Sequence, residues 1–253
     1  RTADLNLNNF DILATSYRKP APTADRANQS MQRALDRISR VSSQLVHTAT
    51  MTSASTVTSP AWRTAVLTAL KKNGKHMPYV KYFQMATVKP DGRPANRTVV
   101  YRGFLGDTPD ITMVTDLRSG KVQEIRANPA GEFAWYMPET RDQFRIAGDL
   151  TVVAHDSATM QKERQEAWAK MSPGGRAQFA WPVPGFPRLD DENPDAFDIP
   201  EELISDPNAV LENFCLVVMR VDEVDHLSLR KNRRWHHTRK GGTDEWETVE
   251  VNP

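Results

Sequence analysis

A succession of short β-type segments, separated by turn residues, constrains the fold of this chain most strongly. β-branched and aromatic residues fill the segments, and Gly, Pro, Asn and Asp occupy the gaps between them. Several short strands at this spacing predict a β-barrel or a β-sandwich. The strands expected in this part of the chain are Tyr82–Val88, Arg97–Tyr101, Ile111–Thr115, Gly131–Met137 and Gln143–Ala154.

Helices and later strands flank this region. A helix is expected from Pro60, capped by Ser59 and ending at Asn73-Gly74. Pro90-Asp91-Gly92 is a turn, so the first two strands form a hairpin. We therefore predict a mainly β protein with flanking helices, an α+β fold. The remaining expected elements are helices over Lys121–Ala127 and 157–171, strands over Phe214–Val221 and Val224–Leu229 with a bulge between them, and a last strand over Trp246–Val251.

Composition divides the 253 residues into two parts. Residues 1–59 lack Trp, are rich in Ser, Thr, Asn and Ala, and form an N-terminal extension before a domain over 60–253. The extension is either a flexible tail or, over residues 1–50, a basic transit segment. The first alternative predicts a cytoplasmic protein, and the second predicts mitochondrial targeting. Within the domain, the proline-rich and acidic residues 173–210 predict a solvated excursion.

Several classes of protein are disfavoured by composition. A formal net charge of +1 argues against a dedicated nucleic-acid binder. No apolar run is long enough to span a membrane. The single cysteine, Cys215, lies in an apolar strand and is expected to be a small buried residue. His236 and His237 are adjacent, so in a strand they point to opposite faces, and we expect no metal site.

The stretch Arg97-Thr98-Val99-Val100-Tyr101-Arg102 places a cation at each end of a β-branched strand. Side chains alternate along a strand, so Arg97 and Tyr101 share one face and Arg102 lies on the other. Two fixed cations at the ends of a rigid strand suit a planar ligand that carries a phosphate. An ordinary strand with solvated ends is the alternative interpretation.

Other segments carry related chemistry. The segment Val114–Lys121 contains the end of a strand, a hydroxyl-rich turn and the start of a helix. The free amides of the helix start, with Ser119 and Lys121, form either an anion site or a plain helix cap. Gln143 offers an amide to the edge of a heterocycle. Residues 230–240 hold six Lys or Arg and no acidic residue. This basic segment could bind nucleic acid, could contact phosphate and a flavin ring, or could be a solvated turn.

The order of these motifs resembles the pyridoxamine 5'-phosphate oxidase family. The resemblance covers about residues 62–253, except for the acidic excursion, and indicates a divergent branch. It implies an antiparallel split β-barrel that binds FMN, and a homodimer with the flavin at the subunit interface. The motifs that carry it are Met85–Val88, Asp91–Pro94, Arg97–Arg102, Val114-Thr115, Ser119, Lys121, Asn128-Pro129, Gln143, Arg234, Arg239, Trp246 and Pro253.

The resemblance also implies roles for single residues. Arg97 and Lys121 would bind the FMN phosphate, assisted by Ser119 and Arg118. The flavin ring would be contacted by Thr98, Val99 and Val100, and the cofactor also by Val114 and Thr115. Gln143 would face the ring, and Arg234 would lie near the electron-accepting edge of the ring. Arg102 would touch both the cofactor and the substrate. A fixed cation near the ring stabilises the negative charge of a reduced flavin. No catalytic residue is assigned.

The implied activity is hydride transfer from a small substrate to FMN, with reoxidation by oxygen. The region that grips the substrate phosphate in the oxidases reads differently here, over Trp168–Gly185, and Arg176 is its candidate phosphate ligand. The substrate histidine of the oxidases is absent. The alternative is therefore an FMN-binding protein without pyridoxine-phosphate oxidase activity, acting as a carrier, a sensor or a reductase on another substrate.

Overall fold

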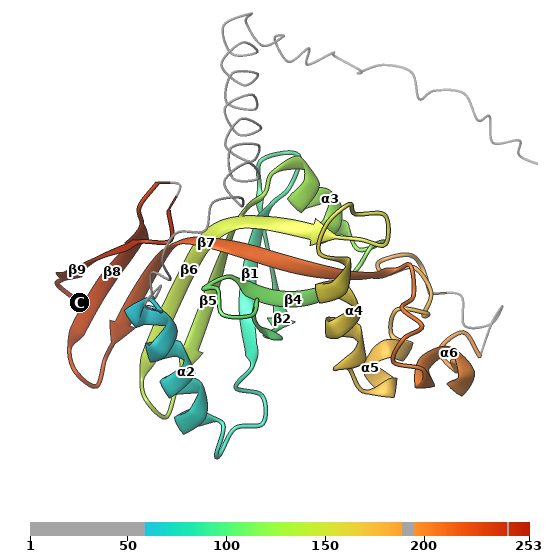
Figure 1. Ribbon diagram of the computed structural model, residues 1–253, viewed down its shortest axis with the longest axis horizontal. Helices are drawn as coiled ribbons and strands as arrows, with labels where there is room; N and C mark the ends of the chain where they lie inside the picture. Colours follow the sequence, from blue (N-terminus) through green and yellow to red (C-terminus); the bar gives the residue numbers. More distant parts are fainter. Residues whose placement is uncertain (1–58, 189–194, 242) are drawn as a thin grey trace, which may run out of the picture. The chain divides into compact units, whose positions relative to one another are not determined.

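The computed structural model describes residues 59–188, 195–241 and 243–253, and the predictions on the N-terminal extension lie outside this part of the chain. Antiparallel strands hold more of the described residues than helices do (Figure 1). The elements are α2 (Ala61–Asn73), β1 (Tyr82–Val88), β2 (Pro94–Val100), β3 (Gly103–Phe104), β4 (Ile111–Asp116), α3 (Gly120–Ala127), β5 (Ala130–Met137), β6 (Asp142–Val153), α4 (Gln161–Ala169), α5 (Pro173–Ala177), α6 (Glu201–Ser205), β7 (Phe214–Ser228), β8 (Arg233–Arg239) and β9 (Trp246–Val251).

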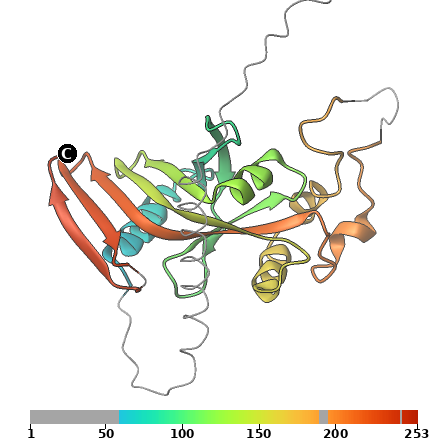
Figure 2. The same ribbon diagram turned by 90° about the horizontal axis from the view of Figure 1, so that it is seen from above.

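All described strands belong to one sheet with the order β2-β1-β5-β6-β7-β4-β3, and β8 and β9 extend it from β7. The 15-residue strand β7 holds the sheet together. One of its edges pairs with β6 along its length, whereas the other edge pairs first with β4 and then with β8. Figures 1 and 2 show β7 running from the α4–α6 side of the domain to the β8–β9 side.

A β-bulge bends β7 midway. Ala147 pairs with Glu223 but Gly148 pairs with Val221, so Asp222 is the extra residue. The predicted bulge between two segments of this strand is thereby confirmed. A Cβ atom on Gly148 would lie 2.0 Å from the Arg220 carbonyl oxygen, which explains the glycine at this crossing.

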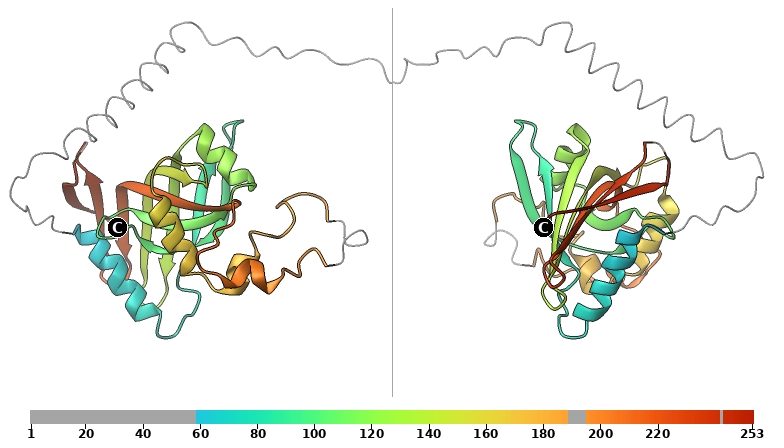
Figure 3. Two further views of the ribbon diagram at one scale, coloured as in Figure 1. Left: turned by 45° about the vertical axis from the view of Figure 1, so that its right-hand side comes forward. Right: turned by 90° about the vertical axis from the view of Figure 1, so that its left-hand side faces the viewer.

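Aromatic side chains fill the barrel. Phe83, Phe133 and Trp135 are buried together, and Trp62 of α2 packs on Trp246 with ring centroids 5.4 Å apart. Helix α2 closes the barrel near Val80, just before β1, while α3 lies near the other end of β1 (Figure 3). The predicted end of α2 at Asn73-Gly74 is confirmed, but Pro60 is the N-cap and no side chain caps the helix.

The segment after β6 differs from the sequence prediction. The helix expected over 157–171 is shorter, because Met160 adopts a left-handed φ of 58° immediately before α4. The predicted solvated excursion is wrong for its first part, where α5 forms and Phe179 packs in a second core with Trp168 and Phe214. Residues 189–194 lie outside the described chain.

The basic segment 230–240 is mainly strand β8, which the sequence prediction missed. Leu229–Asn232 form the turn, with Asn232 at a φ of 51°. Ion pairs neutralise part of its charge, since Arg233 pairs with Glu250 on β9, and Arg239 pairs at 2.9 Å with Asp110, which precedes β4. Short strand β3 was also missed. No described helix is long and apolar enough to cross a membrane.

His237 lies on the inner face of β8 and is 3% exposed. Its Nδ1 atom is 2.9 Å from the Thr248 hydroxyl on β9. Burial, with His226 and His236 nearby, lowers the pKa of His237 to about 4. The folded protein therefore holds this imidazole neutral at pH values where an unfolded chain protonates it.

We predict that His237 makes the domain sensitive to acid. The pKa of His237 rises from about 4 in the folded state to 6.5 in the unfolded state. Between pH 6.5 and 4 the unfolded state therefore binds one proton that the folded state does not bind. The free energy of unfolding therefore falls as the pH falls. This residue should lower the free energy of unfolding by about 2 kcal/mol between pH 7.5 and 5. Urea unfolding of His237→Gln should show a correspondingly smaller loss, while the exposed control His155→Gln follows the wild type. Equal losses in all three proteins would contradict the assignment.

Candidate functional site

Arg97 of β2 lies in a compact polar cluster at the α3 end of the barrel. Its Nη2 atom donates to Glu124 Oε2 at 2.6 Å, and its Nη1 atom donates to the Thr87 hydroxyl. Thr87 in turn donates to the same carboxylate oxygen at 2.5 Å. The Arg97 side chain is 23% exposed and that of Glu124 is 12% exposed. The cluster is thus partly shielded from water.

Lys121 brings a second cation to this cluster from the first turn of α3. Its Nζ atom donates to Thr115 Oγ1 at 3.0 Å and to Ser119 Oγ at 2.5 Å. Ser119 is the N-cap residue of α3, yet its side chain caps no amide. Burial lowers the pKa of Lys121, and the charge of Arg97 lowers it further. The structure therefore brings four sequence-predicted residues, Arg97, Thr115, Ser119 and Lys121, into one cationic cluster.

Glu124 and Thr87 are members of this cluster that sequence reasoning did not single out. Burial alone would raise the pKa of Glu124, but hydrogen bonds from Thr87 and Arg97 lower it below its usual value. A sequence signal existed, because Glu124 follows Lys121 by three residues on a predicted helix and therefore shares its face.

The residues that follow Arg97 point to different sides of the sheet. Val99 pairs with Phe83 and packs on the core, so it offers a ligand its backbone. Thr98 and Val100 lie on the outer face, where Val100 pairs with Tyr82. Val114 of β4 packs on the second core. The predicted ring contacts of β2 therefore divide between the core face, with Val99, and the outer face, with Thr98 and Val100.

Gln143 and Arg234 lie on the outer face, in one row across the sheet. Gln143 pairs with Leu227, and Leu227 pairs with Arg234, so the three side chains share a face. Asp225 binds the Arg234 guanidinium at 2.9 and 2.5 Å, which orients it. Along the sheet, Gln143 lies three strand spacings from β2, about 14 Å, and Arg234 lies five spacings from it, about 24 Å.

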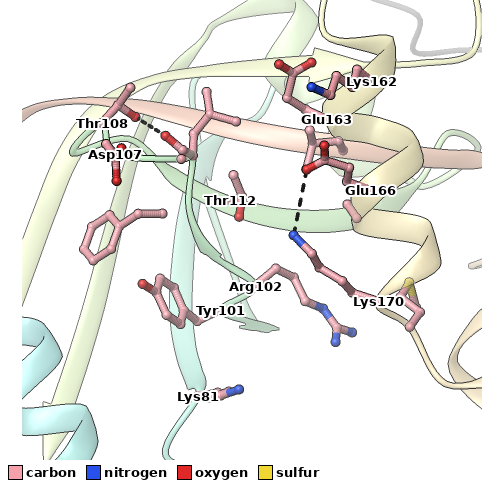
Figure 4. A pocket seen from close by; sticks show the side chains of 16 residues that line it. Lys81, Tyr101, Arg102, Asp107, Thr108, Thr112, Lys162, Glu163, Glu166 and Lys170 are labelled. Atoms are coloured by element: carbon pink, nitrogen blue, oxygen red, sulfur yellow. Dashed lines mark hydrogen bonds and ion pairs between the residues drawn. The ribbon is translucent and has the colours of Figure 1, made fainter.

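Arg102 lies elsewhere, in a cavity of about 700 Å³ between the β3–β4 region and α4. Figure 4 shows the Arg102 side chain beside Lys170, whose ammonium is 4.0 Å from Glu166. Tyr101 and Thr112 also line this cavity. Burial lowers the pKa of Arg102. Within the described residues, no ion pair of Arg102 is found, so its charge is available to an anion.

Two predicted ligands hold protein groups instead. Arg118 binds Asp116 at 2.7 Å and the Trp181 carbonyl at 2.9 Å, so it fastens the segment after α5 to the end of β4. Arg176 is 5% exposed and donates to the carbonyls of Met171 and Ile204 at 3.2 and 2.7 Å. Arg176 does not line the cavity that contains Arg102. Its role in substrate binding stays a prediction that this geometry does not favour.

Residues 59–154 match the family described as pyridoxamine 5'-phosphate oxidase, FMN-binding domain. Pyridoxine/pyridoxamine 5'-phosphate oxidase 2 of Arabidopsis thaliana is 33% identical over 198 residues, which cover 76% of this chain and 96% of that relative. The chain therefore belongs to the pyridoxamine 5'-phosphate oxidase FMN-binding family, as its sequence motifs predicted.

Solved structures agree on the fold. A pyridoxamine 5'-phosphate oxidase-related, FMN binding protein from Nostoc punctiforme is 42% identical, with a TM-score of 0.71 over 77% of this chain and 98% of that chain. PhzG from Burkholderia lata, in complex with tetrahydrophenazine-1-carboxylic acid, is 19% identical and has a TM-score of 0.61 over 77% of this chain and 93% of that one. The fold is the FMN-binding split barrel, as predicted.

Proposed function

We propose that this protein binds FMN and is an oxidoreductase that resembles pyridoxamine/pyridoxine 5'-phosphate oxidase. The observation that carries the proposal is the cluster of Arg97 and Lys121, two partly buried cations from β2 and α3, with the hydroxyls of Thr115 and Ser119 beside Lys121. A phosphate monoester fits this cluster, because it accepts hydrogen bonds from all four residues and restores the charge state that burial disfavours in Lys121.

The flavin ring is proposed to lie between two copies of the chain. Thr98 and Val100 adjoin the phosphate cluster, whereas Gln143 and Arg234 lie three and five strand spacings from β2. One FMN held at Arg97 therefore meets the Gln143–Arg234 row more easily from a partner subunit. Exposed apolar side chains on this outer face, Tyr82, Tyr136 and Val249, support a homodimer interface.

When bound, FMN supplies the ability to accept a hydride from a substrate carbon. The residues of this chain hold the cofactor and place the substrate. Arg102 borders the cavity beneath α4, so we propose it as the contact for an anionic substrate group. The relatives named as pyridoxine/pyridoxamine 5'-phosphate oxidases suggest a phosphorylated vitamin B6 compound as that substrate.

A second candidate function has its own observation. Arg176, the predicted ligand of a substrate phosphate, holds backbone carbonyls. This arrangement favours an FMN-binding protein that acts as a carrier, a sensor or a reductase on another substrate.

Oxygen uptake by the flavin-loaded protein separates the two candidate functions. We expect uptake with pyridoxamine or pyridoxine 5'-phosphate and its loss in Arg102→Ala. A flavin-loaded wild type without uptake would favour the second function.

Removing either cation should weaken FMN retention much more than it weakens the fold. We expect Arg97→Ala and Lys121→Ala each to raise the dissociation constant for FMN about tenfold or more, since each removes a charged hydrogen bond to phosphate. Flavin fluorescence titration gives the constants, and Arg93→Ala, an exposed turn residue, is the matched control. Variants that retain FMN like the control would refute the phosphate assignment.

A site shared between subunits makes a further prediction. Co-expression of Arg97→Ala and Arg234→Gln chains with different tags yields hybrid dimers in which one site carries both changes and the other is intact. The purified hybrid should hold about half as much FMN as the wild-type dimer. If each site lay within one subunit, the hybrid would hold only the average of the two mutant homodimers, and that result would contradict the shared site.

A further inference from the structure

Glu124 stands among the cations that would hold the cofactor phosphate. Its Oε2 atom accepts hydrogen bonds from Arg97 at 2.6 Å and from Thr87 at 2.5 Å. Because Thr87 also accepts a hydrogen bond from Arg97, the three side chains close a triangle. One terminal nitrogen of the Arg97 guanidinium therefore already binds an anion that belongs to the protein.

The charges of the cluster show what this means for a phosphate. Arg97 and Lys121 contribute two positive charges, Glu124 contributes one negative charge, and Asp116 is neutralised by Arg118. A phosphate dianion that approaches Arg97 and Lys121 meets the carboxylate of Glu124 in a partly desolvated place. Solvent and salt screen such a repulsion only weakly, since the Glu124 side chain is 12% exposed.

We propose that Glu124 is an internal competitor for Arg97, which lowers the affinity of the site for the FMN phosphate and keeps the cofactor exchangeable. This inference rests on the proposed FMN site. Binding then exchanges one partner of Arg97 for another: the ion pair with Glu124 is weakened while the ion pair with phosphate forms. The carboxylate acts on the phosphate alone, so it affects phosphorylated flavins and leaves the affinity for the ring unchanged.

Glu124→Gln tests the charge with little change of shape, because the amide oxygen still accepts hydrogen bonds from Arg97 and Thr87. The experiment is a fluorescence titration of the full chain, freed of flavin, with FMN and separately with riboflavin, which lacks the phosphate. We expect Glu124→Gln to bind FMN about tenfold more tightly than the wild type does, and to bind riboflavin equally well. Glu247→Gln, an exposed residue on β9, is the control for net charge and should change neither affinity.

The outcomes separate this inference from the proposed function. A wild type that binds FMN, with a Glu124→Gln variant that binds it no more tightly than Glu247→Gln does, would overturn the role of Glu124 alone. Equal tightening for FMN and riboflavin would also overturn it. A wild type that does not bind FMN would overturn the proposed function together with this inference. If Glu124→Gln does not fold, Glu124→Ala removes the same charge from a helix that accepts alanine, with the same expected gain for FMN.

Discussion

Strand β7 is the constraint on which the rest of the domain depends. It pairs with β6 along one edge, and it divides the other edge between β4 and β8. The bulge at Asp222 lets one strand serve both halves of the sheet, and Gly148 leaves room for the crossing. The β4 side of β7 carries Thr115, and the β8 side carries Arg234.

This division explains how the candidate site is distributed. The cations that we propose to bind a phosphate lie at the end of the barrel where β2 meets α3, and the polar row of Gln143 and Arg234 lies on the outer face of later strands. Neither part is complete by itself. A second copy of the chain can place the outer row of one subunit against the phosphate cluster of the other, so the proposed cofactor site and the proposed dimer stand or fall together.

Local sequence patterns predicted most of the fold because turn residues and β-branched runs act over short distances. The limits of Tyr82–Val88 and Trp246–Val251 were predicted as observed. Strand β8 was missed because its arginines are typical of a solvated segment, whereas in the fold Arg233 and Arg239 pair with the carboxylates of Glu250 and Asp110. The clustering of Arg97 with Lys121 followed from family motifs. The i+3 spacing places Glu124 on the same helix face as Lys121, but its pairing with Arg97 and the hydrogen bonds of Arg176 depend on contacts between distant segments, which spacing along the chain does not encode.

The central claim is that Arg97 and Lys121 hold the phosphate of an FMN shared between two subunits. A crystal structure of the protein with FMN tests it most directly. The account predicts phosphate oxygens within about 3 Å of Arg97 and Lys121, and a flavin ring that reaches Arg234 of the partner subunit. A phosphate bound elsewhere, or a flavin enclosed by a single subunit, would contradict it.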